Sequence, residues 1–400
     1  MRRTIRSDST FDAVGTDCSG KDGNLAGTWV APTCASVLVN GAEGDRPSFL
    51  FLFRSYSFPE VCVRLIMITA AFLGIVASAS AEPRSARKPR VEMVEIGTAF
   101  PYATTIPVAI NNHGVVVGFA WHPDEYWIFT WTPSIGFDLI LFDGVPTDIN
   151  DRGQVVGKVE RCIYIYDDYY YGYGYEDRCY ETGFVWSASD GLKDLGDFVP
   201  AAINNDGDMA GVCWSNSQPC AMLDGVLTVV PTDPVGDGYA TAINDKGVVA
   251  GFYTIGNPED GDYGNRPFTW SHRDGLRTLS RGTAASANVA AINSRGMVVG
   301  TTNDQLWDYQ SRATIWTGKQ ILRQSPPDQT SWVAVNKHGL VVGNRWSETK
   351  PTQPMMWLPK SGITAFPRSG WTSGYAADVN DSGQVVGVAS GKAIIWRVRP

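Results

Sequence analysis

The chain has few histidines and an excess of acidic over basic residues. Four histidines among 400 residues leave little room for a histidine-based metal or catalytic cluster. The net charge of −8 argues against a nucleic-acid partner and against docking on an anionic membrane, because both need a basic surface. The sequence also contains no nucleophile elbow, zinc signature or phosphate-binding loop. We therefore expect no metal, no cofactor and no nucleic-acid partner.

A hydrophobic run of membrane-spanning length is also missing. The apolar run Leu65–Ala77 has 13 residues, whereas a transmembrane helix needs about 20. Arg64 precedes this run and the small residues Ala79–Ala81 follow it, which is the pattern of a secretory signal peptide. We predict a signal peptide over 63–81 and a mature chain that is secreted or periplasmic and does not insert into a membrane.

The segments on either side of the predicted signal peptide carry no repeat. Signal peptides stand at the N-terminus of a chain. We therefore expect residues 1–62 to be an unstructured leader or the product of a mis-assigned start codon, with true initiation near Val63 or Met67. We interpret residues 82–90 as a linker to the repeats, which occupy 91–400.

The chain does contain seven copies of one motif, Ile-Asn-x-x-Gly-x-Val-Val-Gly, with Val in place of the Ile in the last two. The asparagines are Asn111, Asn150, Asn204, Asn244, Asn293, Asn336 and Asn380. A first glycine follows each of them by three residues, and a second follows by seven. The second glycines are Gly118, Gly157, Gly211, Gly251, Gly300, Gly343 and Gly387. Consecutive asparagines lie 39 to 54 residues apart, a spacing typical of repeat architectures.

Each repeat contains four short pieces that are typical of strands. The first ends at Ile-Asn, and a tight turn leads to the second at Val-Val-Gly. A loop of variable length precedes the third, which carries a Trp in six copies, as in Phe268–Trp270; in the remaining copy Asp224 aligns with this Trp. A short turn gives the fourth, such as Gly275–Leu279. Four antiparallel strands in about 44 residues make one propeller blade. The sequence thus predicts an all-β fold, a seven-bladed β-propeller of four-stranded antiparallel blades.

The two ends of the repeat array predict a closed ring. The seventh repeat ends without a fourth strand, whereas Val91–Ile96 is a surplus fourth strand ahead of the first motif. If the two meet, the N-terminal strand (about 91–96) completes the last blade, and closure removes exposed sheet edges. We expect this ring to be a monomer.

The repeats resemble those of the HAF-repeat family of predicted extracellular bacterial proteins, whose motif continues with His-Ala-Phe-x-Trp. The resemblance covers about residues 91–400. The first half of the motif matches in all seven copies, but no copy reads His-Ala-Phe; the nearest are Arg266–Trp270 and Thr182–Trp186. The resemblance implies export and a propeller-like fold. It implies no chemistry, because the family motif is structural.

The recurring Asn and Gly residues are predicted to be structural turn residues. Asn closes Asx turns, and both residue types accept a positive φ. A calcium loop is the alternative, because 148–153 and 378–383 begin Asp-x-Asn and end in Gly. The fifth position of these segments is Arg152 or Ser382, however, and most copies begin with Ala. We therefore predict no metal site in these turns.

Four cysteines remain beyond the predicted signal peptide, and an even number in an exported chain indicates disulfides. In each of the two repeats, one cysteine follows the second Gly and the other precedes the Trp position. The two separations, counted as positive and negative, have the same sum in both repeats, which is expected if each pair consists of antiparallel partners in one common register. We predict the disulfides Cys162–Cys179 and Cys213–Cys220. The separation between the second Gly and the first cysteine differs between the two repeats by an odd number of residues. Because side chains alternate along a strand, ideal pleating places the two pairs on opposite blade faces unless a bulge intervenes.

A meander topology places the variable second-to-third and fourth-to-first loops on one face of the ring. Long insertions of this kind usually mark the binding face. The candidate ligand-binding residues there are Trp127, Tyr169, Tyr170, Tyr171, Tyr173, Tyr175, Asp260, Asp262, Tyr263, Trp307, Tyr309, Trp346 and Trp371. The Tyr-rich stretch 164–175 is either a surface that binds sugars or protein, or a solvent-exposed hairpin extension whose tyrosines pack on one another.

We expect an exported, non-catalytic binding module that holds a glycan or a protein on this face. The alternative is a carbohydrate-active enzyme, a glycosidase or lyase, with acidic residues on the same face. Glycosidase chemistry usually needs two carboxylates at a fixed separation, and no motif here selects such a pair. A third possibility is a structural or adhesive surface protein.

Overall fold

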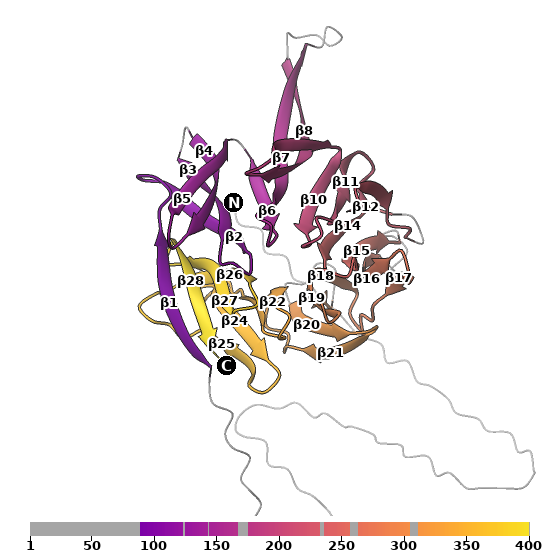
Figure 1. Ribbon diagram of the computed structural model, residues 1–400. Helices are drawn as coiled ribbons and strands as arrows, with labels where there is room; N and C mark the ends of the chain where they lie inside the picture. Colours follow the sequence, from indigo (N-terminus) through magenta and orange to yellow (C-terminus); the bar gives the residue numbers. More distant parts are fainter. Residues whose placement is uncertain are drawn as a thin grey trace, which may run out of the picture. The chain divides into compact units, whose positions relative to one another are not determined.

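A computed structural model describes residues 89–122, 125–142, 144–166, 175–232, 236–256, 263–304 and 311–399. These residues form seven four-stranded antiparallel sheets arranged around a central axis (Figure 1). Six sheets follow the chain as simple meanders, and the seventh combines both ends of the ring. The all-β, seven-bladed propeller predicted from the motif count is confirmed.

The first two strands of each blade are joined by the Asn turns. The innermost strands are β2 (Thr104–Ile110), β6 (Val145–Ile149), β10 (Phe198–Ile203), β14 (Gly238–Ile243), β18 (Ser286–Ile292), β22 (Thr330–Val335) and β26 (Gly374–Val379). The second strands are β3 (Val116–His122), β7 (Val155–Tyr166), β11 (Met209–Cys213), β15 (Val249–Ile255), β19 (Met297–Asn303), β23 (Val341–Arg345) and β27 (Gln384–Ala389).

The outer half of each blade is a second hairpin. The third strands are β4 (Glu125–Thr132), β8 (Tyr175–Ser187), β12 (Gln218–Leu223), β16 (Gly264–Ser271), β20 (Ser311–Thr317), β24 (Gln353–Leu358) and β28 (Lys392–Arg399). The outer strands are β5 (Gly136–Phe142), β9 (Gly191–Gly196), β13 (Val226–Val229), β17 (Gly275–Thr278), β21 (Gln320–Gln324), β25 (Gly362–Ala365) and β1 (Arg90–Gly97). A 3-10 helix, η1 (Trp214–Asn216), joins β11 to β12. No helix in the described ranges is long and apolar enough to cross a membrane.

The ring closes as we predicted from the surplus N-terminal strand. β1 pairs antiparallel with β28, from Arg90 opposite Arg399 to Gly97 opposite Ala393, and completes the sheet β1-β28-β27-β26. The first described strand therefore holds the last blade together, and the two ends of the repeat array are tied by strand pairing.

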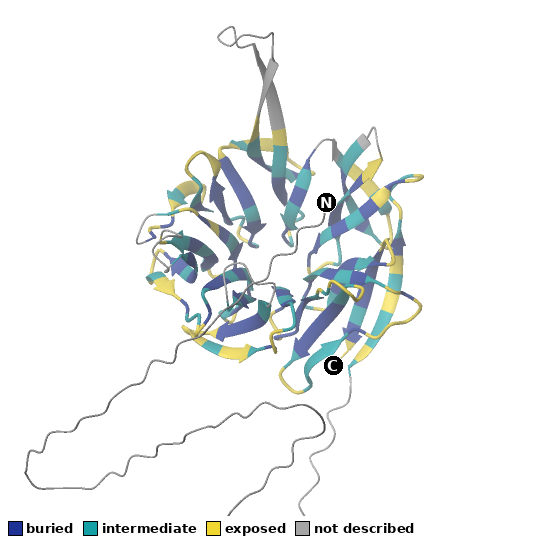
Figure 2. Cartoon of the chain, turned by 180° about the vertical axis from the view of Figure 1, so that it is seen from behind, coloured by how far each residue is buried: buried dark blue, intermediate teal, exposed yellow. Residues whose placement is uncertain are grey.

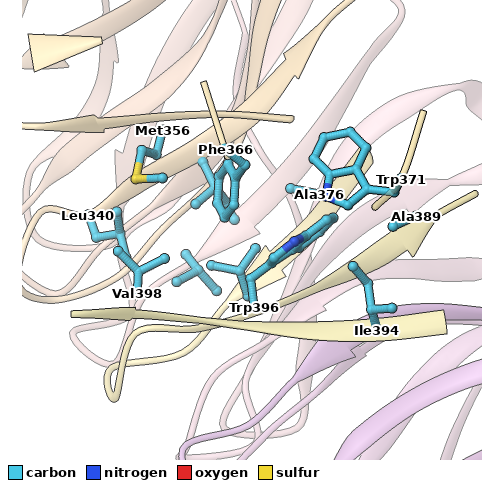
Figure 3. Packing of buried hydrophobic residues seen from close by; sticks show 13 residues of the cluster. Leu340, Met356, Phe366, Trp371, Ala376, Ala389, Ile394, Trp396 and Val398 are labelled. Carbon is cyan, nitrogen blue, oxygen red and sulfur yellow. The ribbon is translucent and has the colours of Figure 1, made fainter. Parts of the chain in front are cut away.

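The hydrophobic core lies between neighbouring blades. Apolar side chains of adjacent sheets are buried against each other, while the outer strands carry most of the exposed positions (Figure 2). Figure 3 shows one such layer, in which Trp396 contacts Phe366 of the preceding blade with ring centroids 5.1 Å apart. The large Trp side chains of the third strands thus fill the wedge-shaped spaces that open between blades.

The second glycines of the motif belong to strands, which corrects their assignment as turn residues. Each lies in the second strand, opposite a β-bulge in the innermost strand of its blade. A Cβ at any of the seven would lie 2.0–2.3 Å from a carbonyl oxygen of that innermost strand. They are glycines because two backbones approach too closely for a side chain. The first glycines are the turn residues, with φ between 67° and 87°.

The third repeat has a different register from the one predicted. Met209 pairs with Met222, so Met222 and not Asp224 stands at the position of the Trp in the other blades. Asp224 lies in the following turn, with a φ of 50°. The predicted alignment of Asp224 with the Trp position was wrong because the third strand of this repeat, β12, contains no Trp to mark its end.

The Cys213–Cys220 disulfide is present, with the two Cα atoms 5.7 Å apart. Cys213 pairs with Gln218 and Cys220 with Gly211, so the disulfide crosses the hairpin diagonally, over η1. In β7 and β8 the backbone places Cys162 directly opposite Cys179. The side chain of Cys162 lies outside the described residues, so this disulfide stays a prediction. Neither hairpin has a register shift between these two strands, so the structure contains no bulge of the kind that the sequence left open.

Candidate functional site

The seven motif asparagines form a closed ring of hydrogen bonds around the central axis. Each Nδ2 donates to the main-chain carbonyl of the Asn in the next blade, at 2.9–3.2 Å, and Asn380 donates back to Asn111. Each Oδ1 also accepts two backbone N–H groups of its own turn at 2.8–3.1 Å. The Asx turn was predicted from the sequence, but the bond between blades was not.

A second, incomplete ring follows one residue later in the turns. The backbone N–H of Asn112 donates to Asp151 Oδ1 at 2.7 Å, and that of Asp151 donates to Asn205 Oδ1 at 2.8 Å. Asn205 donates to Asp245, and the same pattern links Lys337 to Asp381 and Asp381 to Asn112. The series is interrupted between Asp245 and Lys337. The Ser294 side chain is too short to accept the Asp245 N–H, and the Lys337 side chain has no acceptor for the Ser294 N–H. Together the two rings line a polar cavity of about 170 Å³ at one mouth of the axis.

Two carboxylates lie just inside this mouth, where most blades have Ala. Asp148 Oδ2 accepts the Ile203 N–H and Asp378 Oδ2 accepts the Ile110 N–H, both at 2.9 Å, so each carboxylate joins its blade to the next. The pKa of Asp148 is raised to about 7, mainly by burial and also by the charge of Asp378, although the backbone hydrogen bonds from Ile203 and Ile149 lower it. Burial also raises the pKa of Asp378. Because all four carboxylate oxygens accept backbone hydrogen bonds, we assign these residues a structural role.

The loop face consists of the second-to-third and fourth-to-first connections. Its best-formed described depression has a volume of about 590 Å³ and is built from three connections, β21–β22, β23–β24 and β25–β26. Trp346 lies in it with 51% of its surface exposed. Its backbone N–H donates to the Gln329 carbonyl at 3.1 Å, which ties the β23–β24 loop to the preceding connection. Trp346 is thus a predicted candidate that the structure places in a surface depression.

The depression also contains charged residues that the sequence did not single out. Arg345 Nε lies 3.3 Å from Asp328 Oδ2 as an ion pair. The Thr330 hydroxyl donates to Asp328 Oδ1 at 2.6 Å, which fixes this carboxylate. Arg368 lies over the ring of Trp371, with Cζ 5.7 Å from the ring centroid. These residues come from separate loops, and no local sequence signal joins them.

Trp371 is a core residue, which corrects its expected position on the binding surface. It is 5% exposed and packs edge-on against Trp396 at 6.2 Å (Figure 3). Its aromatic character in a loop suggested an exposed ligand platform, but the loop folds back over the seventh blade. Its face instead supports Arg368.

The remaining predicted candidates are dispersed or lie outside the described residues. Trp127 and Tyr263 are half-buried, in β4 and just before β16. The backbone of β7 and β8 continues pairing to Tyr166 and Tyr175, so 159–166 and 175–181 form the hairpin extension seen in Figure 1. Tyr169, Tyr170, Tyr171, Tyr173, Asp260, Asp262, Trp307 and Tyr309 lie outside the described residues, as does the side chain of Tyr175.

The opposite face, formed by the first-to-second and third-to-fourth turns, also has depressions. An apolar one of about 640 Å³ lies between the sixth and seventh blades, beside Leu358, Pro359 and Val398. A smaller one of about 250 Å³ lies beside Trp270 and Arg295. Sequence reasoning missed them because they form between turns of neighbouring blades. Among the described residues, no three His, Cys, Asp or Glu side chains gather as a metal-ligand group.

The described sheets define the chain as a seven-bladed β-propeller. Virginiamycin B lyase from Staphylococcus aureus superimposes with a TM-score of 0.50 at 8% identity, over 78% of this chain and 100% of that one. A streptogramin B lyase gives 0.48 at 9% identity, over 77% and 98% of the two chains. A gluconolactonase from Xanthomonas campestris gives 0.36 at 8% identity, over 78% and 91%. At such identities the likeness concerns the fold alone.

No protein-family model matches the sequence. No curated protein matches it either.

Proposed function

We propose that this protein is an exported, non-catalytic binding module that holds a glycan on its loop face, in the depression around Trp346. The observation that carries the proposal is the exposure of Trp346, 51% in a depression of about 590 Å³. Small-ligand sites commonly have volumes of about 300–1,000 Å³. An indole offers a flat apolar face on which a sugar ring can stack.

The surroundings of Trp346 favour a ligand over a merely solvent-exposed side chain. Its backbone is anchored on Gln329, a residue other than glycine that holds a φ of 57°. Backbone strain of this kind collects at ligand sites, because the surrounding structure must maintain it. Gln353 and Arg345 line the same depression and bring polar groups to it. An aromatic platform flanked by hydrogen-bonding groups suits a sugar better than an apolar ligand.

Export is the second part of the proposal. The Cys213–Cys220 disulfide supports it, since disulfides persist in oxidising compartments. The signal-peptide pattern over 63–81 and the resemblance of the repeats to the HAF-repeat family support it as well. We therefore propose that the mature chain acts outside the cytoplasm, in the periplasm or beyond it.

The test is a glycan array probed with the wild-type protein, together with a reducing-sugar release assay on every glycan that binds. We expect binding without release, and loss of binding in Trp346→Ala. The matched control is Trp214→Ala, because Trp214 is 40% exposed on another loop-face turn. Sugar release would contradict the non-catalytic assignment and favour the carbohydrate-active enzyme. An array without signal, or capture of a protein ligand alone, would contradict the glycan assignment.

A further inference from the structure

The depression around Trp346 is cationic in an acidic protein. Three cationic side chains line it, Arg345, Lys350 and Arg368, against the acidic Asp328 and Glu348. The whole chain carries a net charge of −8. A local surplus of positive charge against that background points to an anionic ligand group.

We propose that the Trp346 depression selects sugars that carry a carboxylate, such as uronic acids, and that Arg345 and Arg368 bind the carboxylate. This inference rests on the proposed function, because it names the ligand class of the same site.

The inner nitrogen of Arg345 lies in an ion pair, and its outer nitrogens stay available. Its Nε is buried 3.3 Å from Asp328 Oδ2 without a hydrogen-bond partner, while 40% of the side chain is exposed. The structure gives its outer guanidinium nitrogens no hydrogen-bond partner among the described residues. A guanidinium has five donors in a rigid planar fork that matches a carboxylate. Asp328 therefore orients the fork and partly neutralises it, and the outer donors can bind a ligand carboxylate.

Arg368 is positioned by an aromatic ring. It is exposed and lies over Trp371, whose own position is fixed in the core against Trp396. A cation held over an indole retains all of its hydrogen-bond donors, because the ring attracts the charge without accepting an in-plane hydrogen bond. Arg368 thus supplies a second guanidinium to the depression.

The loop that carries Trp346 is ordered before any ligand binds. The Ser347 hydroxyl accepts the Thr349 N–H at 3.3 Å and the Lys350 N–H at 3.2 Å, which closes a local turn. A preformed loop loses little conformational freedom on binding. The indole and the two guanidinium groups are therefore presented together, one for the sugar ring and the others for its charge.

The experiment is isothermal titration of the full chain with two probes of equal length, a galacturonate trisaccharide and the corresponding neutral galactose trisaccharide. We expect the acidic probe to bind at least about tenfold more tightly, as is usual for hydrogen bonds to a charged group. Raising the salt concentration from 50 to 500 mM should reduce this preference, because the groups are partly exposed.

The variants are Arg345→Gln and Arg368→Gln, with Arg323→Gln on the exposed outer strand β21 as the control. We expect Arg345→Gln to lower the affinity for the acidic probe about tenfold and to leave that for the neutral probe unchanged. If Arg345→Gln also lowers the affinity for the neutral probe, Arg368→Gln is the deciding variant. We expect Arg368→Gln to bind the neutral probe as the wild type does and to show a smaller preference for the acidic probe.

The possible failures are distinguishable. Equal binding of both probes contradicts the carboxylate assignment and leaves the proposed function standing. Acidic preference that survives in both arginine variants contradicts the site assignment. Binding of neither probe contradicts the carboxylate assignment, and the proposed function falls with it only if the whole array is also without signal.

Discussion

Replacing Asn293 by Asp should weaken the propeller at one link of the Asn ring. Asn293 is 5% exposed; its Nδ2 donates to the Asn336 carbonyl at 2.9 Å, and its Oδ1 accepts two backbone N–H groups at 3.0 Å. Asp retains the acceptor and replaces the donor by an oxygen that faces the carbonyl. Only the bond between blades is lost, and the turn keeps its two hydrogen bonds.

The expected magnitude follows from the lost bond and from the oxygen that replaces the donor. The Asn336 carbonyl keeps the Gly339 N–H as a donor at 3.1 Å. A lost hydrogen bond costs about 1 kcal/mol, and the new carboxylate oxygen, buried without a donor, costs about 1–3 kcal/mol. We therefore expect Asn293→Asp to reduce the free energy of unfolding by about 3 kcal/mol. Asn293→Ala should cost about 4 kcal/mol, because it also removes the acceptor of two backbone N–H groups.

The assay is urea unfolding followed by tryptophan fluorescence, with Ser294→Ala as the control. Ser294 is the next residue in the same turn and takes part in neither ring, so its replacement should change the free energy of unfolding by less than about 0.5 kcal/mol. A loss below about 1 kcal/mol in Asn293→Asp, or a loss equal to that of the control, would refute the stabilising role of the ring.

Three further predictions concern the scaffold. Gly300→Ala places a Cβ 2.0 Å from a carbonyl and should reduce the free energy of unfolding by about 3 kcal/mol, whereas Gly318→Ala, with open space around it, should cost about 1 kcal/mol from its positive φ alone; equal melting temperatures of the two variants would contradict this. Because the folded-state pKa of Asp148 is raised to about 7, its contribution to stability is present below pH 4 and is lost as the pH rises through 7. Urea titrations at pH 4 to 8 should show that fall, about 2 kcal/mol after allowance for its partial exposure, and show it reduced in Asp148→Asn; an unchanged slope would refute the assignment. Removing the Cys213–Cys220 disulfide by Cys213→Ser should cost about 2 kcal/mol for so short a loop; reduction of the wild-type protein should cost at least as much, because it would also break the predicted Cys162–Cys179 disulfide, and an unchanged stability of Cys213→Ser would contradict this.

The architecture was predictable because each blade carries its own copy of one short sequence motif. The turn at Asn204 recurs in every repeat, and the surplus strand at Val91 needed only a count of missing and extra strands. What the motif could not reveal is why its polar residue is Asn. The partner of the Asn204 side chain is the Asn244 carbonyl, 40 residues away in the chain, and the turn itself would accept Asp or Ser.

Register and exposure were harder to predict than strand number. Asp224 was aligned with the Trp position because spacing alone marked the strand end, whereas hydrogen bonding puts Met222 there. Trp371 and Trp346 are both aromatic residues in loop-face connections, yet one is 5% and the other 51% exposed. The difference arises from how each loop packs on its neighbours, which no local pattern encodes.

The candidate site was predictable only in outline. The loop face and Trp346 followed from insertion lengths and aromatic content. Arg345 and Arg368 did not, because their significance depends on Asp328 and Trp371, which come from other connections. A cationic depression on an acidic protein becomes visible only when separate loops are brought together.

The most direct test of the proposed function is a crystal structure of the protein with the tightest-binding glycan from the array. We expect a sugar ring stacked on the indole of Trp346, within the depression of the loop face. A glycan bound at the mouth lined by the Asn ring, or in the apolar depression beside Leu358, with Trp346 free of contact, would contradict it.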